Sequence, residues 1–285
     1  MYDVIIIGSG PAGSSAAIYT SRAQLDTLII SKDKGAMAKS EKIENYYGFP
    51  TPVSAEKLIA DGILQAERFG AKVIDDQVIN ISFEDEFVIK TVTNEYKAKS
   101  VIIATGSNRT APKIEGFSNF EGKGISYCAL CDGFFYKGKD VAVLGCCEYA
   151  RHEVMDLLPI AKTVTLITNG AAVLADFPEK VKIITQEIAT FEGKDVLQAV
   201  RFLDGSTLPV TGVFIAIGVA GSSDLAKQLG AQTEGLRISV DENMATNIPG
   251  LYAAGDCTGG IMQIVKAAYE GAKAGIEVVK NIRKR

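Results

Sequence analysis

The chain has 285 residues, 47% apolar and 22% charged, which is the composition of a globular protein with one large or two ordinary domains. Its 30 lysines and arginines and 34 acidic residues give a net charge of −4, which argues against a nucleic-acid partner. No apolar run reaches transmembrane length, so we expect no membrane partner. No basic signal-like segment opens the sequence, and five cysteines, an odd number, do not suit the disulfide framework of a secreted protein. We therefore expect a cytoplasmic protein.

The first 30 residues have the pattern of a dinucleotide-binding unit. The β-branched apolar run Tyr2–Ile7 predicts a buried parallel strand, and we expect a helix over 14–22 and a second strand over 27–30. The turn after the first strand is glycine-rich, and its predicted cofactor-binding residues are Gly8, Gly10, Pro11, Ala12 and Gly13. The three glycines allow a tight bend, close approach of the backbone to a pyrophosphate, and close helix–strand packing, while the helix N-terminus favours the phosphate.

The end of the second predicted strand departs from this pattern. Dinucleotide-binding units usually carry an acid here that holds a ribose hydroxyl. Ser31 and Lys32 stand at this point instead, and we assign both to the cofactor site. We expect either the Ser31 hydroxyl or Asp33 to take the place of the acid.

The next segment leads back to the same predicted site. We expect an irregular loop over 34–50, a helix over 54–69, and then a small antiparallel layer of short strands that ends near residue 96. A further buried strand begins at Ser100. It ends in Ala104, Thr105 and Gly106, small residues that let the backbone come close to a cofactor.

Two cysteines at redox spacing follow a predicted linker over 112–120. Cys128 and Cys131 form a C-x-x-C pair, and Asp132 comes directly after it. A C-x-x-C pair that opens a helix has a lowered thiol pKa, and the thiolate is the form that attacks a disulfide. Asp132 is placed to handle the proton when that bond breaks. A structural zinc site would need a second Cys or His pair with matching spacing, so we predict a redox pair and no metal site.

A second, degraded dinucleotide unit follows the cysteines. We expect a strand over 140–144, a strand-to-helix turn over 145–150, and another strand over 163–167. The last segment returns to the first unit with an apolar strand that ends in Gly255 and Asp256. The Asp256 carboxylate is placed to reach a ribityl or ribose hydroxyl, and a helix over 259–285 closes the chain.

These motifs, in this order, resemble the low-molecular-weight thioredoxin reductases over essentially the whole chain. The matching segments are the glycine turn at 8–13, Glu44-Asn45, Ala104-Thr105-Gly106, the C-x-x-C-D-G stretch and Ala254-Gly255-Asp256. Gln263 stands where that family has a glutamine beside the flavin, so the resemblance adds Asn45 and Gln263 to the cofactor site. It further implies FAD as cofactor, a homodimer, and a thioredoxin-type protein as electron acceptor.

The resemblance also implies the fold and the roles of the two cysteines. The expected fold is α/β, with two Rossmann-like three-layer (ββα) dinucleotide-binding domains, the second inserted into the first. The FAD-binding domain would span 1–113 and 242–285, and the inserted pyridine-nucleotide-type domain, 114–241, would carry the cysteines. By resemblance, Cys131 faces the flavin and Cys128 attacks the partner disulfide.

The second nucleotide unit departs from the NADPH-using members of that family. Cys147 stands at the middle glycine position, where a pyrophosphate needs bare backbone. Residues 168–171, Thr-Asn-Gly-Ala, replace a basic His-Arg-Arg cluster that grips the 2′-phosphate, and Leu174 replaces a further arginine. Residues 34–38 also differ from the family's Gly-Gly-Gln-Leu near the flavin. These changes are similar to those of the ferredoxin-dependent flavin thioredoxin reductases, so the expected donor is ferredoxin, not NADPH.

Other functions stay open on the sequence alone. One is a conventional NADPH-dependent thioredoxin reductase, and another is an FAD-dependent dithiol oxidase that passes electrons to oxygen. A third is a flavoprotein redox sensor that does not turn over. The adjacent Cys146 and Cys147 are interpreted as small buried fillers, and Cys257 as a small residue packed near the cofactor.

Overall fold

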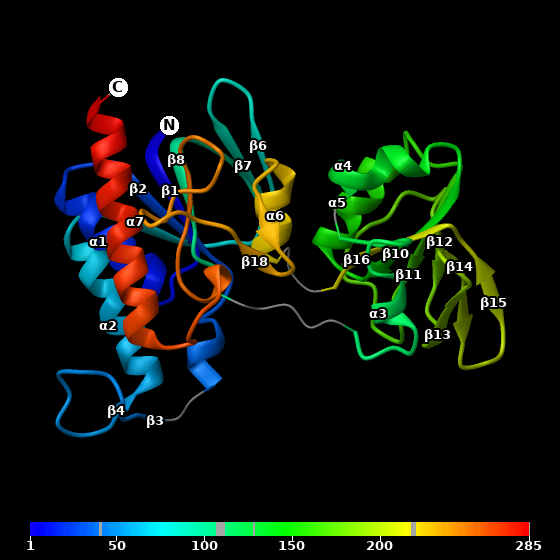
Figure 1. The fold of residues 1–285 in the computed structure, drawn as a ribbon, viewed down its shortest axis with the longest axis horizontal. Helices are drawn as coiled ribbons and strands as arrows, with labels where there is room; N and C mark the ends of the chain where they lie inside the picture. Colours follow the sequence, from blue (N-terminus) through cyan, green and yellow to red (C-terminus); the bar gives the residue numbers. More distant parts are fainter. Residues whose placement is uncertain (40–41, 107–111, 128, 218–220, 285) are drawn as a thin grey trace. The chain divides into compact units, whose positions relative to one another are not determined.

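The structure is a computed structural model that describes residues 1–39, 42–106, 112–127, 129–217 and 221–284. The chain divides into two compact units, one formed by 1–109 and 221–285 and the other by 110–220 (Figure 1). The fold is α/β with one largely parallel sheet in each unit, which confirms the predicted fold class.

The return to the first unit comes earlier in the chain than the predicted boundary after residue 241. Helix α6 (Ser222–Gln228) contacts strand β6 (Val78–Phe83), which belongs to the first unit. The Gln228 side-chain oxygen accepts a hydrogen bond from the Ile81 N–H at 2.8 Å, and Ser222 Oγ donates to the Gly106 carbonyl at 2.8 Å. These contacts place 221–241 with the first unit, although no local pattern in the segment indicates which unit it joins.

The first unit is built on one seven-stranded sheet in the order β5-β2-β1-β8-β7-β6, with β19 also paired to β8. Strands β1, β2, β5, β8 and β19 are mutually parallel, and β6 and β7 add antiparallel pairs. The bounds are β1 (Tyr2–Ile7), β2 (Thr27–Ser31), β5 (Lys72–Asp75), β6 (Val78–Phe83), β7 (Phe87–Thr91), β8 (Glu95–Ile103) and β19 (Leu251–Ala253). The first two strands therefore form where the apolar pattern predicts them.

Strand β8 joins two parts that the sequence pattern predicts as separate. Its first half pairs with β7, as in Phe87↔Ala98, and its second half pairs with β1 and β19, as in Leu251↔Val101. The predicted antiparallel layer and the predicted strand at 100–106 are thus one sheet. The polar residues 95–99 hide this continuity in the sequence, because only Ala98 among them is fully buried.

Besides α6, the described helices of this unit are α1 (Pro11–Arg22), α2 (Ala55–Arg68) and α7 (Ile264–Lys284). Helices α1 and α7 pack closely, because a Cβ at Gly271 would lie 2.0 Å from the Ala12 carbonyl oxygen (Figure 1). Helix α7 begins five residues later than predicted, since Gly259 and Gly260 have φ of 84° and 76°, outside the helical region. Short elements complete the unit: η1 (Ala36–Lys39), β3 (Lys42–Ile43), β4 (Val53–Ser54), β17 (Thr233–Glu234), β18 (Arg237–Ile238) and η3 (Asp256–Thr258).

The second unit has a five-stranded parallel sheet in the order β12-β11-β10-β16-β9 and a three-stranded antiparallel sheet, β13-β14-β15. The strands are β9 (Ile125–Ser126), β10 (Asp140–Gly145), β11 (Thr163–Ile167), β12 (Lys182–Ile184), β13 (Ile188–Gly193), β14 (Leu197–Phe202), β15 (Thr207–Pro209) and β16 (Gly212–Ala216). The helices are α3 (Phe117–Phe120), α4 (Ala129–Asp132), η2 (Gly133–Tyr136) and α5 (Glu148–Leu157). Phe117 and Phe120 are buried in this unit's core, so the segment predicted as a linker is part of the fold.

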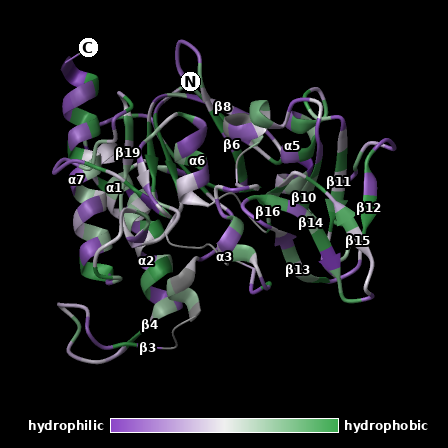
Figure 2. Ribbon diagram, turned by 45° about the vertical axis from the view of Figure 1, so that its right-hand side comes forward, coloured by the Kyte–Doolittle hydropathy of each residue, from purple (hydrophilic) through white to green (hydrophobic). Residues whose placement is uncertain are grey.

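Apolar residues follow the central strands of both sheets, while α7 alternates between apolar and polar along its length (Figure 2). The four strands β1, β2, β8 and β19 supply the buried centre of the first unit, together with the inner faces of α1 and α7. Within the described ranges, we find no helix that is both long and apolar enough to cross a membrane.

Candidate active site

The predicted cofactor residues of the first unit gather at one edge of its sheet. Strands β2, β1, β8 and β19 are parallel neighbours, so their carboxyl ends meet at the same edge. The glycine turn follows β1, Ser31 ends β2, Ala104 follows β8, and Gly255 comes shortly after β19. Ligands of open parallel sheets bind at this edge.

The glycine turn after β1 is shaped to receive a phosphate group. Gly8 has φ 107°, and a Cβ there would lie 2.4 Å from the Ala104 carbonyl oxygen. A Cβ at Gly13 would lie 1.8 Å from the Gly8 carbonyl oxygen, so both positions require glycine. A Cβ at Gly10 would meet nothing within 4 Å, and no side chain caps the helix that Pro11 begins. The turn therefore leaves space over bare backbone at a helix N-terminus, where an anion binds well.

Ser31 connects the glycine turn to the end of β2. Ser9 Oγ donates a hydrogen bond to Ser31 Oγ at 2.8 Å, and Ser31 Oγ donates in turn to the Asp33 carbonyl at 2.9 Å. The Ser31 proton is therefore committed, and its remaining lone pair can accept a hydrogen bond from a ribose hydroxyl. The Asp33 carboxylate accepts from the Gly35 N–H at 2.7 Å, and Lys32 is exposed. Of the two predicted substitutes for the acid, Ser31 is the one connected to the phosphate turn.

The turn after β8 holds an unsatisfied polar atom. Thr105 Oγ1 is buried and has no hydrogen-bond partner among the described residues. A buried hydroxyl without a hydrogen-bond partner usually lowers the stability of the folded protein by about 1–3 kcal/mol, unless a ligand or water molecule makes the missing hydrogen bond. Gly106, which follows, has φ 74°. Together with the open glycine turn, this orphaned hydroxyl shows that the site fits a bound dinucleotide.

Two predicted flavin-side residues, far apart in the chain, meet in the structure. Asn45 Nδ2 donates a hydrogen bond to Gln263 Oε1 at 3.0 Å. Gln263 directly precedes α7, and Asn45 follows the short strand β3. The nearby aromatic residue Tyr47 is 96% exposed.

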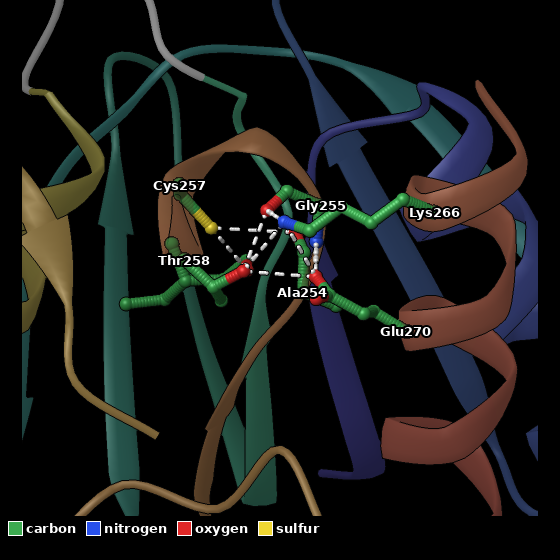
Figure 3. Close-up of polar contacts among 7 residues, drawn as sticks. Ala254, Gly255, Cys257, Thr258, Lys266 and Glu270 are labelled. Carbon is green, nitrogen blue, oxygen red and sulfur yellow. Dashed lines mark hydrogen bonds and ion pairs between the residues drawn. The ribbon is translucent and has the colours of Figure 1, made fainter. Parts of the chain in front are cut away.

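A buried ion pair from α7 holds the turn that contains Gly255 and Asp256 (Figure 3). Glu270 Oε2 accepts a hydrogen bond from the Gly255 N–H at 2.9 Å and lies 2.8 Å from Thr258 Oγ1. Lys266 Nζ lies 3.0 Å from the same carboxylate oxygen and donates to the Gly255 carbonyl at 2.8 Å and to Thr258 Oγ1 at 2.9 Å. Both charges are largely buried, with side-chain exposures of 14% and 11%. The pair therefore fixes the turn in one shape.

Sequence reasoning missed Lys266 and Glu270. The signal was present as a Lys-x-x-x-Glu spacing, which puts both side chains on one face of a helix. That spacing is common on exposed helices, and only the packing of α7 against the Gly255 turn makes it part of the site.

The same surroundings set the protonation of Asp256 and Cys257. Burial raises the pKa of Asp256; the positive charge of Lys266 opposes this effect, and the negative charge of Glu270 adds a smaller rise. Burial raises the pKa of Cys257 to about 12, and its Sγ lies 3.4 Å from the Ile103 carbonyl oxygen and 3.3 Å from that of Ala254. Cys257 is thus a buried neutral thiol, whereas Asp256 is partly accessible beside the glycine turn.

The predicted redox segment belongs to the second unit. Cys128 lies outside the described residues, as does the side chain of Cys131, whose backbone is part of α4. Asp132 Oδ2 accepts a hydrogen bond from Ser126 Oγ at 2.6 Å. Burial, together with the charge of Asp132, raises the pKa of Tyr136. Asp132 is thus held in place by a hydroxyl donor from the neighbouring strand β9.

The second strand-to-helix turn differs from the first. Cys147 is the N-cap residue of α5, and the Leu174 N–H donates to the Cys146 carbonyl at 2.7 Å, so residues after β11 fold onto the turn. Cys146 and Cys147 form no disulfide, and burial, with Cys147 nearby, raises the pKa of Cys146. Asn169, which follows β11, accepts a hydrogen bond from the Ile188 N–H at 2.6 Å. Residues 168–174 contain no lysine or arginine that could pair with a phosphate.

An open glycine turn after a buried strand in one unit and a C-x-x-C-Asp segment on a second nucleotide-type unit are together the pattern of the flavoprotein disulfide oxidoreductases. Residues 2–271 match the family described as pyridine nucleotide-disulphide oxidoreductase. The chain belongs to this family and, within it, to the low-molecular-weight thioredoxin reductases. The resemblance stated from the motifs is thereby confirmed at the level of family, and the family implies a flavin.

Relatives and solved structures agree on this placement. A thioredoxin reductase of Listeria innocua is 38% identical over 304 residues, which cover 99% of this chain and 94% of the relative. The atypical thioredoxin reductase TRi from Desulfovibrio vulgaris Hildenborough is 40% identical, with a TM-score of 0.93 over 100% of this chain and 99% of that one. A ferredoxin-flavin thioredoxin reductase from Clostridium acetobutylicum is 30% identical, with a TM-score of 0.72 over 100% and 99% of the two chains.

Proposed function

We propose that this protein is an FAD-dependent thioredoxin-disulfide reductase whose electron donor is not NADPH, with ferredoxin as the favoured donor. The observation that carries the proposal is the contrast between the two strand-to-helix turns. The first leaves bare backbone open over Gly10, whereas the second has Cys147 at the helix N-cap and the Leu174 segment hydrogen-bonded to it. One turn suits a dinucleotide and the other does not.

The residues that would hold FAD are those at the edge of the first sheet. The pyrophosphate would lie on the glycine turn at 8–13, and Ser31 would accept a hydrogen bond from a ribose hydroxyl. Thr105, Asp256 and the Asn45–Gln263 pair would take the remaining polar groups. When bound, FAD supplies a two-electron carrier between a donor and a disulfide.

NADPH binding would lose its strongest contacts in the second unit. The 2′-phosphate of NADPH is normally held by charge-assisted bonds to basic side chains, each worth about 1.5–3 kcal/mol. Residues 168–174 offer none of these. Loss of two such contacts would weaken binding by roughly two to four powers of ten. NADH lacks the 2′-phosphate but needs the same pyrophosphate-binding turn. Because the Leu174 N–H is hydrogen-bonded to this turn, NADH would bind here no better than NADPH.

In the proposed reaction the Cys128–Cys131 disulfide takes up two electrons and two protons and becomes a dithiol. Cys128 then attacks the disulfide of a thioredoxin-type protein, and Cys131 resolves the mixed disulfide and releases the reduced partner. Asp132 exchanges protons with the departing thiolate, and the Ser126 hydroxyl orients its carboxylate. The net result is transfer of two electrons and two protons from one disulfide couple to the other.

A homodimer is part of the proposal. Val265, Tyr269 and Ile276 lie on one face of α7 by helical spacing, and all three are exposed in the single chain. An apolar stripe of this kind suits contact with a second copy. Light scattering should give twice the 30.3 kDa chain mass, and a monomer mass would refute this part of the proposal.

An anaerobic optical experiment tests the donor. The flavin absorbance of the purified protein is followed after mixing with excess NADPH, with excess NADH, or with at least four equivalents of reduced ferredoxin, because two electrons reduce the Cys128–Cys131 disulfide and two more are needed to reduce the flavin. We expect bleaching by ferredoxin and none by either nucleotide. Rapid bleaching by NADPH would instead identify a conventional reductase. If air is then admitted, fast reoxidation of the reduced flavin by oxygen, with turnover of a small dithiol, would identify a dithiol oxidase.

The matched control separates the flavin from the cysteines. In Cys128→Ser/Cys131→Ser protein, ferredoxin should still bleach the flavin, but reduction of thioredoxin should stop. Reductase activity that survives in this variant would disprove the role assigned to the two cysteines.

A further inference from the structure

Helix α5 holds the redox segment on both sides of Cys128 in the chain. Tyr149 Oη donates a hydrogen bond to the Tyr127 carbonyl at 3.1 Å, and Glu153 Oε2 accepts one from the Ala129 N–H at 2.6 Å. Tyr149 and Glu153 are four residues apart, so both point from the same face of α5. Helices α4 and α5 lie side by side within the second unit (Figure 1).

Glu153 is an unusual residue for this position. Its exposure is 1%, and glutamate is rarely this deeply buried without a specific partner. A leucine or methionine of similar volume would fill the same space without desolvating a carboxylate, so packing alone does not account for it. The Ala129 N–H donates to the Glu153 carboxylate at 2.6 Å, which is a short hydrogen bond, and hydrogen bonds to ionised acceptors are shorter than those between neutral groups.

The position of this carboxylate has a consequence for the neighbouring cysteine. Backbone N–H groups at the start of a helix are the donors that stabilise a thiolate. Glu153 occupies the N–H of Ala129, the first residue of α4 and the residue that follows Cys128. It also brings negative charge to the segment where the dithiol would carry its own negative charge. Both effects disfavour the reduced form relative to the disulfide.

We propose that Glu153 is a positioning residue that fixes the backbone of the redox segment through Ala129 and makes the Cys128–Cys131 dithiol a stronger reductant. This inference rests on the proposed role of these cysteines as the redox pair, but not on the identity of the donor. A more strongly reducing dithiol passes its electrons more completely to a thioredoxin-type disulfide.

The test is a redox equilibrium of the intact flavoprotein with glutathione under anaerobic conditions. In this reaction the Cys128–Cys131 disulfide and two molecules of reduced glutathione give the dithiol and one molecule of glutathione disulfide. Alkylation followed by peptide mass spectrometry counts the two thiols separately from Cys146, Cys147 and Cys257. Glu153→Gln keeps the size and an acceptor oxygen but removes the charge. We expect its equilibrium constant to shift at least tenfold toward the dithiol, which is about 30 mV.

Two variants on the same helix control for general disturbance. Glu148→Gln removes a carboxylate whose visible partner is the partly exposed Arg151, at 3.7 Å, and its equilibrium should stay within twofold of the wild type. Tyr149→Phe removes the adjacent hydrogen bond without a change of charge, and it should also stay within twofold. A Glu153→Gln constant within twofold of the wild type would overturn the proposal.

The remaining outcomes are also decisive. If Glu153→Gln does not fold, Glu153→Asp retains the charge but draws the carboxylate back from Ala129. It should shift the constant at least threefold in the same direction, and a wild-type value would refute the inference. A wild-type protein in which the two cysteines never form a disulfide would instead refute the proposed function, so the two failures are distinguishable.

Discussion

Replacement of Lys266 by methionine should destabilise the first unit more than any change at an exposed lysine. Methionine keeps the length of the side chain but removes the cation that contacts Glu270 at 3.0 Å, together with two hydrogen bonds to the Gly255 turn. Breaking a buried ion pair by removal of one partner costs about 3–5 kcal/mol. Glu270 retains the Gly255 N–H and the Thr258 hydroxyl, so we expect about 2–3 kcal/mol.

Calorimetry of the apoprotein can measure this loss. For a unit of this size, about 2–3 kcal/mol corresponds to a fall of roughly 4–12 °C in the unfolding temperature. Lys280→Met on the same helix is the control, because Lys280 pairs with Glu277 at a position where its side chain is 56% exposed. Such an exposed pair is worth at most about 1 kcal/mol.

A double-mutant cycle shows whether the loss comes from the pair. Once Glu270 is changed to glutamine, Lys266→Met should cost at least about 1 kcal/mol less than it does in the wild type. Equal costs in both backgrounds, or a Lys266→Met effect no larger than that of Lys280→Met, would refute the reasoning. FAD affinity, measured by quenching of flavin fluorescence, should fall in Lys266→Met, because the Gly255 turn is no longer held.

Three further predictions concern Asp256, Thr105 and Asp3. Burial raises the pKa of Asp256, so its ionised form destabilises the apoprotein at pH 7. Asp256→Asn should therefore raise the unfolding temperature of the apoprotein but weaken FAD binding. A lower unfolding temperature would contradict this prediction. Thr105→Val removes an unsatisfied hydroxyl, so it should stabilise the apoprotein by about 1 kcal/mol and lower the affinity for FAD. An unchanged affinity would show that the hydroxyl does not contact the cofactor. Burial acts to raise the pKa of Asp3, but hydrogen bonds from Lys99 at 2.8 Å and the Asp26 N–H lower it overall. This contribution is fully present above about pH 4 and is lost as the pH falls through the lowered pKa of folded Asp3, so Lys99→Met should cost up to about 1 kcal/mol at pH 7 and clearly less at pH 3 in urea titrations. An equal loss at both pH values would exclude the pair as its cause.

The predictions that succeeded rest on local patterns. Strands β1 and β11 have the predicted bounds, because a β-branched apolar run between turn residues suffices to indicate a buried strand. The glycine turn at 8–13 was equally predictable, since each glycine answers a local steric demand. The thioredoxin reductase family also followed from the order and spacing of short motifs.

The predictions that failed depend on contacts across the chain. Residues 112–120 look like a linker because the segment is short and its polar and apolar residues follow no helix or strand period. Nevertheless, Phe117 and Phe120 are buried in the core of the second unit. The segment from Gly221 joins the first unit through contacts of α6 with β6, which no local pattern encodes. The hydrogen bond between Asn45 and Gln263 was not predicted, because it spans 218 positions of sequence, although the sequence indicates each residue for the cofactor site.

The sequence by itself thus determined the family and the steric demand for glycine in the turn at 8–13, and it predicts the cysteine pair, because these depend on residue type and short spacing. Only the tertiary structure decided that Lys266 and Glu270 hold the Gly255 turn, and that Glu153 meets the backbone beside Cys128. A lysine or glutamate on a helix is ordinarily solvated, and the sequence around it does not show which other part of the chain packs against its side chain. Packing removes the water from these few side chains, and their charges then act on the backbone that they touch.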